Sequence, residues 1–146
     1  MKIAWITLIV AFLNAPPVVG ADRYLCLPEL STGFRWSETA KRWNQENFAT
    51  DITKYLVEQS EVVGQEDSFI VKQIGSDYPA HNSCKRRRTG DGSLTPLIVC
   101  GSLGYAFMMN VETLRYQEIY TIGFIDGLDS SGDTPSLTIG RCSSLD

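Results

Sequence analysis

The sequence predicts an all-β domain, an antiparallel β-barrel or sandwich of about eight short strands stapled by disulfides. Three features carry this prediction: one long alternating segment, an internal repeat of a hairpin, and short apolar runs separated by turn residues at roughly ten-residue spacing. Two segments, 37–43 and 110–116, begin with good helix-capping residues. Both are short, and a strand, a turn and a second strand explain them better.

The alternating segment spans residues 114–126. From residue 114 to residue 125, its even positions read Leu, Tyr, Glu, Tyr, Ile and Phe, and its odd positions read Arg, Gln, Ile, Thr, Gly and Ile. Successive side chains of a strand point to opposite faces, so the even positions form one aromatic face. That face contains a single carboxylate, Glu118, between Tyr116 and Tyr120.

The repeat relates two segments far apart in the chain. Residues 33–37 (GFRWS) are followed by four residues and then by Arg42 and Trp43. Residues 106–110 (AFMMN) are followed by four residues and then by Arg115 and Tyr116. The same spacing at both places predicts two equivalent hairpins with turns of one length.

The other strands are read from β-branched and aromatic runs between polar or glycine-containing segments. Segment 95–101 is apolar on both faces and is therefore placed in the centre of the sheet. Segment 75–96 is polar and rich in proline and glycine, and it is expected to be a long irregular loop. The predicted strands are residues 24–28, 32–36, 42–48, 54–59, 68–74, 95–101, 105–110, 114–126 and 134–142.

Residues 1–21 are predicted to be a signal peptide, and residues 22–146 a single β-domain. A cation, Lys2, precedes the apolar run 3–13, and the segment ends in small residues at Ala21. The run is shorter than the roughly 20 residues that a membrane span needs, so no transmembrane span is expected in the mature chain. We therefore expect a periplasmic or secreted protein.

The cysteines all lie in the part of the chain expected to be exported: Cys26, Cys84, Cys100 and Cys142. An even number in an oxidising compartment predicts two disulfides. Three pairings are compatible with the sequence, and we favour Cys84 with Cys100 and Cys26 with Cys142. The first pair closes a short loop, and the second would join the first and last strands if the sheet closes on itself.

A basic run is the most unusual local feature, because the chain as a whole has a net charge of −4. Arginine side chains grip phosphate or carboxylate groups, so the run is a candidate anion- or partner-binding loop; a solvated loop is the alternative. The run consists of Lys85, Arg86, Arg87 and Arg88.

Glu118 is the second candidate, together with Tyr116 and Tyr120. If the even face is the interior, this acid could bind a polar ligand or act as a general acid. The alternative is a break in register that places Glu118 at a sheet edge or beside Arg42 or Arg115.

The sequence gives little support to metal, cofactor or nucleophilic chemistry. Asp126, Asp129 and Asp133 cluster near glycines, but their spacing does not match a calcium-binding loop and an ordinary turn is expected. His81 is the only histidine, and neither a P-loop nor a dinucleotide-binding motif occurs, so no metal and no cofactor is expected. The acidic balance also argues against nucleic-acid binding.

Short motifs near both ends of the chain resemble small bacterial proteins that carry signal peptides and have no assigned activity. The motifs are GF-x-W at 33–36, K-x-W at 41–43, KY-x-V at 54–57, TP at 134–135 and I-G-x-C at 139–142. The resemblance implies an exported β-domain and carries no catalytic residue across.

These features together predict a non-catalytic domain that binds a protein partner or a small amphipathic ligand. Small periplasmic barrels that inhibit lysozyme, and barrels that carry lipid, are precedents for the architecture only. Two alternatives stay open: a small hydrolase that uses carboxylates such as Glu46, Glu58 and Glu118, and a structural component of an envelope.

Overall fold

A computed structural model describes residues 23–62, 67–132 and 134–145. The predicted signal peptide, residues 1–21, lies outside the described residues. The described part is all-β apart from one helical turn. Its elements are β1 (Arg23–Ser37), β2 (Arg42–Asn47), β3 (Tyr55–Gln59), β4 (Ser68–Gln73), β5 (Pro79–Arg88), β6 (Leu94–Ser102), β7 (Tyr105–Asn110), β8 (Arg115–Tyr120), α1 (Ile122–Ile125) and β9 (Ser136–Ser144).

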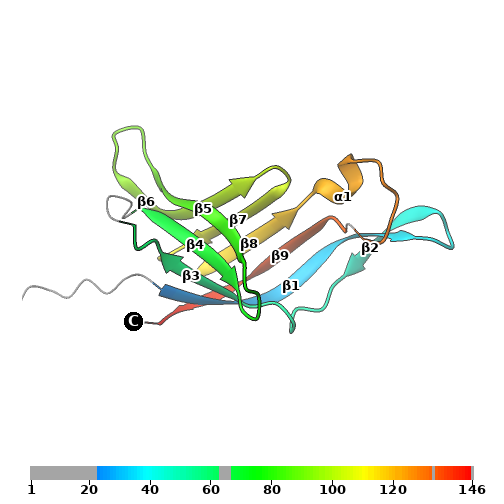
Figure 1. The fold of residues 1–146 in the computed structure, drawn as a ribbon, viewed down its shortest axis with the longest axis horizontal. Coiled ribbons are helices and arrows are strands. Elements are labelled where there is room, and N and C mark those ends of the chain that lie inside the picture. The colour runs from blue at the N-terminus through cyan, green and yellow to red at the C-terminus, as the bar shows by residue number, and fades with distance from the viewer. Residues whose placement is uncertain (1–22, 63–66, 133, 146) are drawn as a thin grey trace, which may run out of the picture.

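The strands form one antiparallel sheet that closes on itself into a barrel. Neighbours follow the order β2-β1-β3-β4-β5-β6-β7-β8-β9, and β1 also pairs with β9. Eight strands therefore make the barrel, and β2 is an extra strand on its rim (Figure 1). The predicted all-β fold of about eight strands is confirmed. Of the two predicted architectures, barrel and sandwich, the structure has the barrel.

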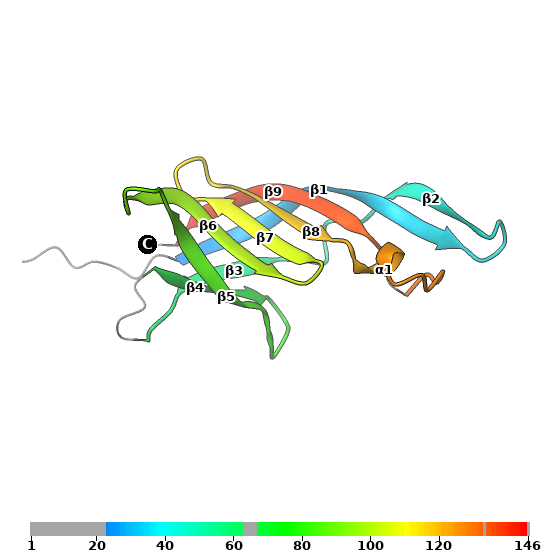
Figure 2. The ribbon, with the colours of Figure 1, turned by 90° about the horizontal axis from the view of Figure 1, so that it is seen from above.

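Strand β1 connects the barrel to a projecting arm. It pairs with β9 from Tyr24 to Gly33, with β3 from Arg23 to Cys26, and with β2 from Thr32 to Ser37. We call β2 and the paired segment Thr32–Ser37 the arm; it extends from the end of the barrel away from the C-terminus (Figure 2). The sequence predicted two strands, 24–28 and 32–36, where the structure has one continuous strand.

Strands β2 and β3 pair with the same edge of β1 but leave a gap between them, which we call the window. Pairing with β3 stops at Cys26 and pairing with β2 begins at Thr32, so the residues between them have no strand neighbour there. At the end of β2, the Phe48 amide donates to the Ser31 carbonyl at 2.9 Å. Residues 48–54 then run past the window to β3.

The interior of the barrel is a single core to which nearly every strand contributes. Its buried apolar residues are Tyr24, Cys26, Tyr55, Val57, Phe69, Val71, Cys84, Ile98, Cys100, Phe107, Met109, Tyr116 and Cys142. Each of these residues alternates with an outward-facing neighbour, as the period of a strand requires.

Both predicted disulfides are confirmed. Cys26 of β1 bonds to Cys142 of β9, and Cys84 of β5 bonds to Cys100 of β6. In each case the two cysteines are direct register partners with both side chains pointing into the barrel. The first bond therefore lies across the seam where the first and last strands close the barrel.

The two hairpins of the sequence repeat have equivalent geometry. Trp36 pairs with Trp43 in one hairpin, and Met109 pairs with Tyr116 in the other. Each turn has four residues, and its last residue is left-handed: Lys41 at φ 50° and Leu114 at φ 55°. The repeat therefore predicted both hairpins correctly, although only the second lies within the barrel wall.

Two predicted elements are wrong. The segment expected to be irregular contains β5, whose ten residues begin at Pro79. A barrel strand needs apolar or satisfied side chains only on its inner face, and proline is tolerated at the first residue of a strand.

The predicted strand 114–126 ends at Tyr120, and α1 follows. Tyr120 is the last register partner of both Tyr105 in β7 and Ser136 in β9, so the chain beyond it has no strand neighbour on either side. No helix in the described residues is long and apolar enough to cross a membrane.

Candidate functional site

The predicted aromatic face of β8 points into the barrel, and it places Glu118 there. The Tyr55 hydroxyl donates to Glu118 Oε2 at 2.6 Å. The Glu118 side chain is 14% exposed, so the carboxylate is largely withdrawn from water but still reached by it. The structure therefore has the interior arrangement, and the edge position beside Arg42 or Arg115 does not occur.

Aromatic rings surround this carboxylate. Phe107 stacks on Tyr116 with ring centroids 5.2 Å apart, and Tyr55 meets both rings edge-on. Tyr120 also faces inward, with its ring 4.8 Å from that of Tyr105. Burial, followed by the nearby charge of Glu118, raises the pKa of both Tyr55 and Tyr116 above the ordinary value. Both phenols therefore keep their protons at neutral pH.

His81 is the interior residue that the sequence prediction missed. It lies on β5, its side chain is 5% exposed, and its Nε2 is 3.8 Å from Glu118 Oε1. That nitrogen has no hydrogen-bond partner among the described residues. The residue was assigned to an irregular loop because its neighbours, Pro79 and Asn82, favour turns. Alternation from Cys84, three residues later, would have placed His81 outside; both side chains face inward because the register shifts at a bulge between them.

A cavity opens beside Glu118 at the arm end of the barrel. Its volume is about 250 Å³, and it lies where the window between β3 and β2 interrupts the wall. Hydroxyl groups dominate its surface, Glu118 lies on its inner side, and Arg35 comes from the arm. The lining residues are Pro28, Ser31, Arg35, Phe48, Ala49, Thr50, Thr53, Tyr55, Glu118, Thr134, Ser136 and Thr138.

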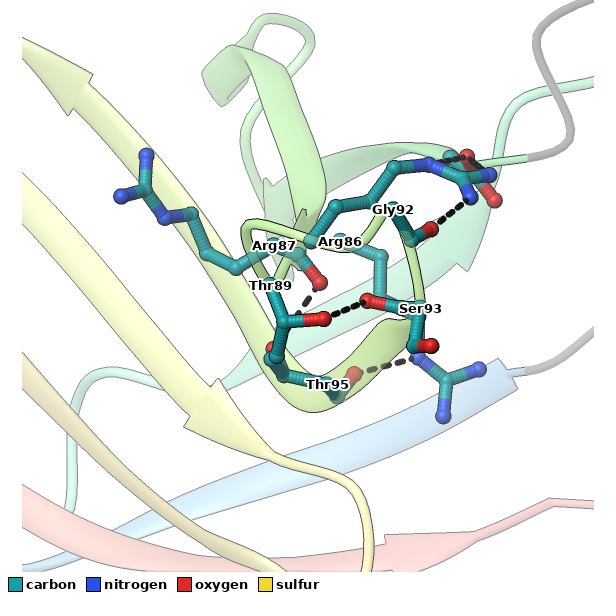
Figure 3. Close-up of polar contacts among 8 residues, drawn as sticks. Arg86, Arg87, Thr89, Gly92, Ser93 and Thr95 are labelled. Carbon is teal, nitrogen blue, oxygen red and sulfur yellow. Dashed lines mark hydrogen bonds and ion pairs between the residues drawn. The ribbon is translucent and has the colours of Figure 1, made fainter.

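The basic run lies at the end of strand β5, where it enters the β5–β6 hairpin, and two of its side chains are engaged internally. Arg86 Nε donates to the Thr95 carbonyl at 3.0 Å, and Arg88 contacts Asp67 and the Gly92 carbonyl. The guanidinium of Arg87 extends away from the hairpin, as Figure 3 shows. Lys85, Arg87 and Arg88 are exposed, and Arg88 is paired with Asp67. Anion or partner binding by this run stays a prediction.

The outer surface of the barrel has one apolar side. We call it the apolar wall: the outward residues Leu30, Val99, Ala106, Met108, Ile119, Leu137 and Ile139 of β1 and β6–β9. Across five strands, Val99, Met108, Gln117, Ile139 and Leu30 are successive register partners. Leu30 is 66% exposed, and Leu137 and Ile139 are each 41% exposed. The sequence prediction took the outward apolar residues of 95–101 as evidence of a central strand, which is wrong for a barrel.

The opposite side of the barrel is charged. On the outer face of β3 and β4, Glu58 pairs with Arg23 at 3.3 Å and with Lys72 at 2.5 Å. Lys85 follows on β5 as the register partner of Ser68. Leu56 and Ile70 also point outward on these strands, beside Lys72 and Glu58, so this side is mixed. The five-strand row of the apolar wall differs from it in containing no charged residue.

The apolar surface continues onto the arm. Leu30, Thr32 and Phe34 share one face of β1 by strand alternation, and Phe34 is 53% exposed. Trp43 of β2 packs edge-on against Phe124 of α1, with centroids 5.8 Å apart. An apolar cavity of about 480 Å³ lies among these side chains. The arm therefore extends the exposed apolar surface beyond the barrel.

The aspartate cluster serves local structure. Asp126 accepts a hydrogen bond from the Leu128 amide at 2.9 Å, and Asp129 accepts one from Trp43 Nε1 at 2.9 Å. Asp133 lies outside the described residues. In the part of the chain that is described, no group of histidine, cysteine and acidic side chains could hold a metal ion.

Comparison of the chain with protein-family models, with curated proteins and with solved structures finds no match. The function is therefore inferred from the apolar wall, the arm and the interior around Glu118.

Proposed function

We propose that this domain is an exported binding protein without catalytic activity, and that it docks a partner protein on the apolar wall and the adjoining face of the arm. The two disulfides support export, because such bonds form and persist in oxidising compartments, the periplasm or the outside of the cell. The observation that carries the docking proposal is the outward row that crosses five strands, in which four of the five residues are apolar and the fifth is Gln117.

An apolar wall of this kind is unusual for a barrel that stands alone in water. Antiparallel strands with one face in solvent ordinarily alternate apolar inside with polar outside. Large contiguous apolar patches on soluble proteins mark interaction surfaces. Burying the side chains of Leu30, Leu137 and Ile139 in an interface would gain about 25 cal/mol for each Å² removed from water.

The charges beside the wall favour an acidic partner over a second copy of this chain. Arg115 and Arg141 are direct register partners on the outer face, next to the apolar row. Arg141 pairs with Glu29 at 3.0 Å, and Arg115 has no ion pair within the described residues. Two guanidinium groups at the edge of an apolar patch suit carboxylates on a partner's rim. A second copy that docked through the same face would place the same arginine pair against this one, and like charges repel.

A carboxylate hydrolase is the weaker proposal. Such an enzyme needs two acids facing one substrate bond, about 5 to 10 Å apart. Glu46 is paired with Arg35, and Glu58 with Arg23 and Lys72, whereas Glu118 is bonded to Tyr55. The three acids therefore have separate partners, and none of these contacts joins one to another.

The test is purification of the tagged protein from the cells that make it, with exposed apolar residues changed one at a time. Leu137→Glu should reduce a stoichiometric partner by about tenfold or more, the size expected at the centre of an interface. Ile74→Glu is the matched control, because Ile74 is 51% exposed and follows β4 on the other side of the barrel. Equal recovery of the partner with both variants would overturn the proposal.

A further inference from the structure

We propose that the cavity beside Glu118 is a second binding site, which takes a small hydroxyl-rich molecule that carries an ammonium group. This site is separate from the apolar wall: it lies inside the barrel end, and its lining is polar where the wall is apolar. The ligand class follows from the charge, the hydroxyl groups and the volume of the cavity.

The charge of the site is that of Glu118. Its Oε2 accepts a hydrogen bond from the Tyr55 hydroxyl at 2.6 Å, and its Oε1 lies 3.8 Å from His81 Nε2. No lysine or arginine of the described residues lies within ion-pair distance of this carboxylate. Arg35, the cation of the cavity lining, is already paired with Glu46 at 3.1 Å. A largely buried carboxylate with no strong cationic partner is a site for a ligand cation.

The Tyr55 hydroxyl fixes the orientation of the acceptor. Burial and the charge of Glu118 raise the pKa of Tyr55, so it remains a donor. Its hydrogen bond fixes the position of Glu118 Oε2. The Tyr55 ring itself packs edge-on against the Phe107 ring, with centroids 5.8 Å apart. The carboxylate is therefore preorganised, and a ligand would lose little affinity to ordering it.

The rest of the lining supplies hydrogen-bonding groups around a small volume. Hydroxyl groups come from β1, from the segment before β3, from β9 and from the residues just before β9: Ser31, Thr50, Thr53, Thr134, Ser136 and Thr138. Each hydroxyl can both donate and accept, which matches the hydroxyl groups of a polyol. Ser31 Oγ and Thr138 Oγ1 lie 2.9 Å apart, so these two already form one edge of the site. A volume of about 250 Å³ admits a molecule of amino-alcohol or amino-sugar size.

The experiment compares two probes that differ only in one group, 2-amino-1,3-propanediol and glycerol. Each is titrated into the oxidised ¹⁵N-labelled protein at pH 7 and constant ionic strength, and amide shifts are followed by NMR. We expect saturable shifts at Ser31, Tyr55 and Thr138 with the amine, in the millimolar range for so small a probe. Glycerol should bind about tenfold more weakly or worse, the usual difference between a charged and a neutral hydrogen bond.

Two variants test whether Glu118 causes the preference for the amine over glycerol. Glu118→Gln keeps an acceptor for Tyr55 but removes the charge, so the amine should bind no better than glycerol. Glu58→Gln removes a carboxylate from the outer wall and should leave the preference intact. If Glu118→Gln does not fold, the comparison of the two probes on the wild-type protein still decides.

Equal affinities for the two probes, or shifts confined to residues outside the cavity, would overturn the proposal. The outcome is independent of the docking test, because no residue of the apolar wall lines this cavity.

Discussion

Replacing Tyr55 by phenylalanine removes one oxygen from the interior and leaves the packing of the ring unchanged. That oxygen donates to Glu118 at 2.6 Å, in a site where the carboxylate side chain is 14% exposed. Loss of a hydrogen bond to a charged group costs about 1.5–3 kcal/mol, and the burial of Glu118 places the expected loss within this range. The measurement is urea unfolding at pH 7 with the disulfides intact, in which the midpoint should fall without a change in slope.

Tyr116→Phe is the matched control for this change. Tyr55 is 4% exposed and Tyr116 is 3% exposed, and their rings contact each other. The Tyr116 hydroxyl, however, is buried without a hydrogen-bond partner among the described residues. Its removal should leave the free energy of unfolding unchanged or raise it. Equal losses for the two variants would refute the assignment of the Tyr55–Glu118 hydrogen bond as the cause.

Three further predictions follow from the same geometry. The raised pKa values of Tyr55 and Tyr116 mean that the unfolded chain releases these protons first, near pH 10, so each tyrosine should lower stability by about 1.4 kcal/mol per pH unit above pH 10. Tyr116→Phe should remove its own share of this fall in alkaline urea titrations. Gly140→Ala should cost more than about 2 kcal/mol in thermal unfolding, since a Cβ there would lie 2.2 Å from a backbone oxygen, whereas Gly101→Ala, with nothing within 4 Å, should be neutral. Arg86→Ala should lose about 1–3 kcal/mol with its bond to a backbone carbonyl, and Arg87→Ala should change stability by less than about 0.5 kcal/mol; the reverse order would contradict the orientation of the basic run.

The parts of the fold that the sequence predicted are those determined by local pattern. Alternation fixed the inward face of β8, and equal spacing fixed the two hairpins. The pairing of Cys26 with Cys142 was predicted from two arguments. Both cysteines lie on the face opposite the leucines of their strands, and the first and last strands become neighbours when a sheet closes into a barrel. Each of these inferences needs only neighbours in sequence or the ends of the chain.

The parts that were missed depend on what the barrel places beside each residue. Strand β5 has a polar sequence, and its inner face is completed by His81 and Cys84. Its partners in β4 and β6 hold it in the sheet despite Pro79 at its start. His81 could be recognised as interior only after this strand was known.

The apolar wall was misinterpreted for a similar reason. A strand that is apolar on both faces, such as the segment containing Ile98 and Val99, ordinarily indicates burial on both sides. In a closed barrel one face must point outward, so the second apolar face is exposed. On the docking proposal, the same sequence signal that predicted a central strand marks the interaction surface.

The cavity was beyond prediction because its lining comes from four separate places in the chain. Ser31, Thr50, Glu118 and Thr138 meet only because β1 exchanges one partner for another and leaves a window. No pattern within one strand records such an exchange.

The most direct test of the docking proposal is photo-crosslinking in the cells that make the protein. A benzophenone amino acid is placed at Ile139, 41% exposed on the apolar wall, and separately at Lys72, on the charged side. The proposal predicts a discrete adduct with a different protein from position 139 and none from position 72. An adduct at twice the mass of the chain would instead place a second copy on the wall. No adduct from position 139, or the same adducts from both positions, would contradict the claim that this face binds a partner.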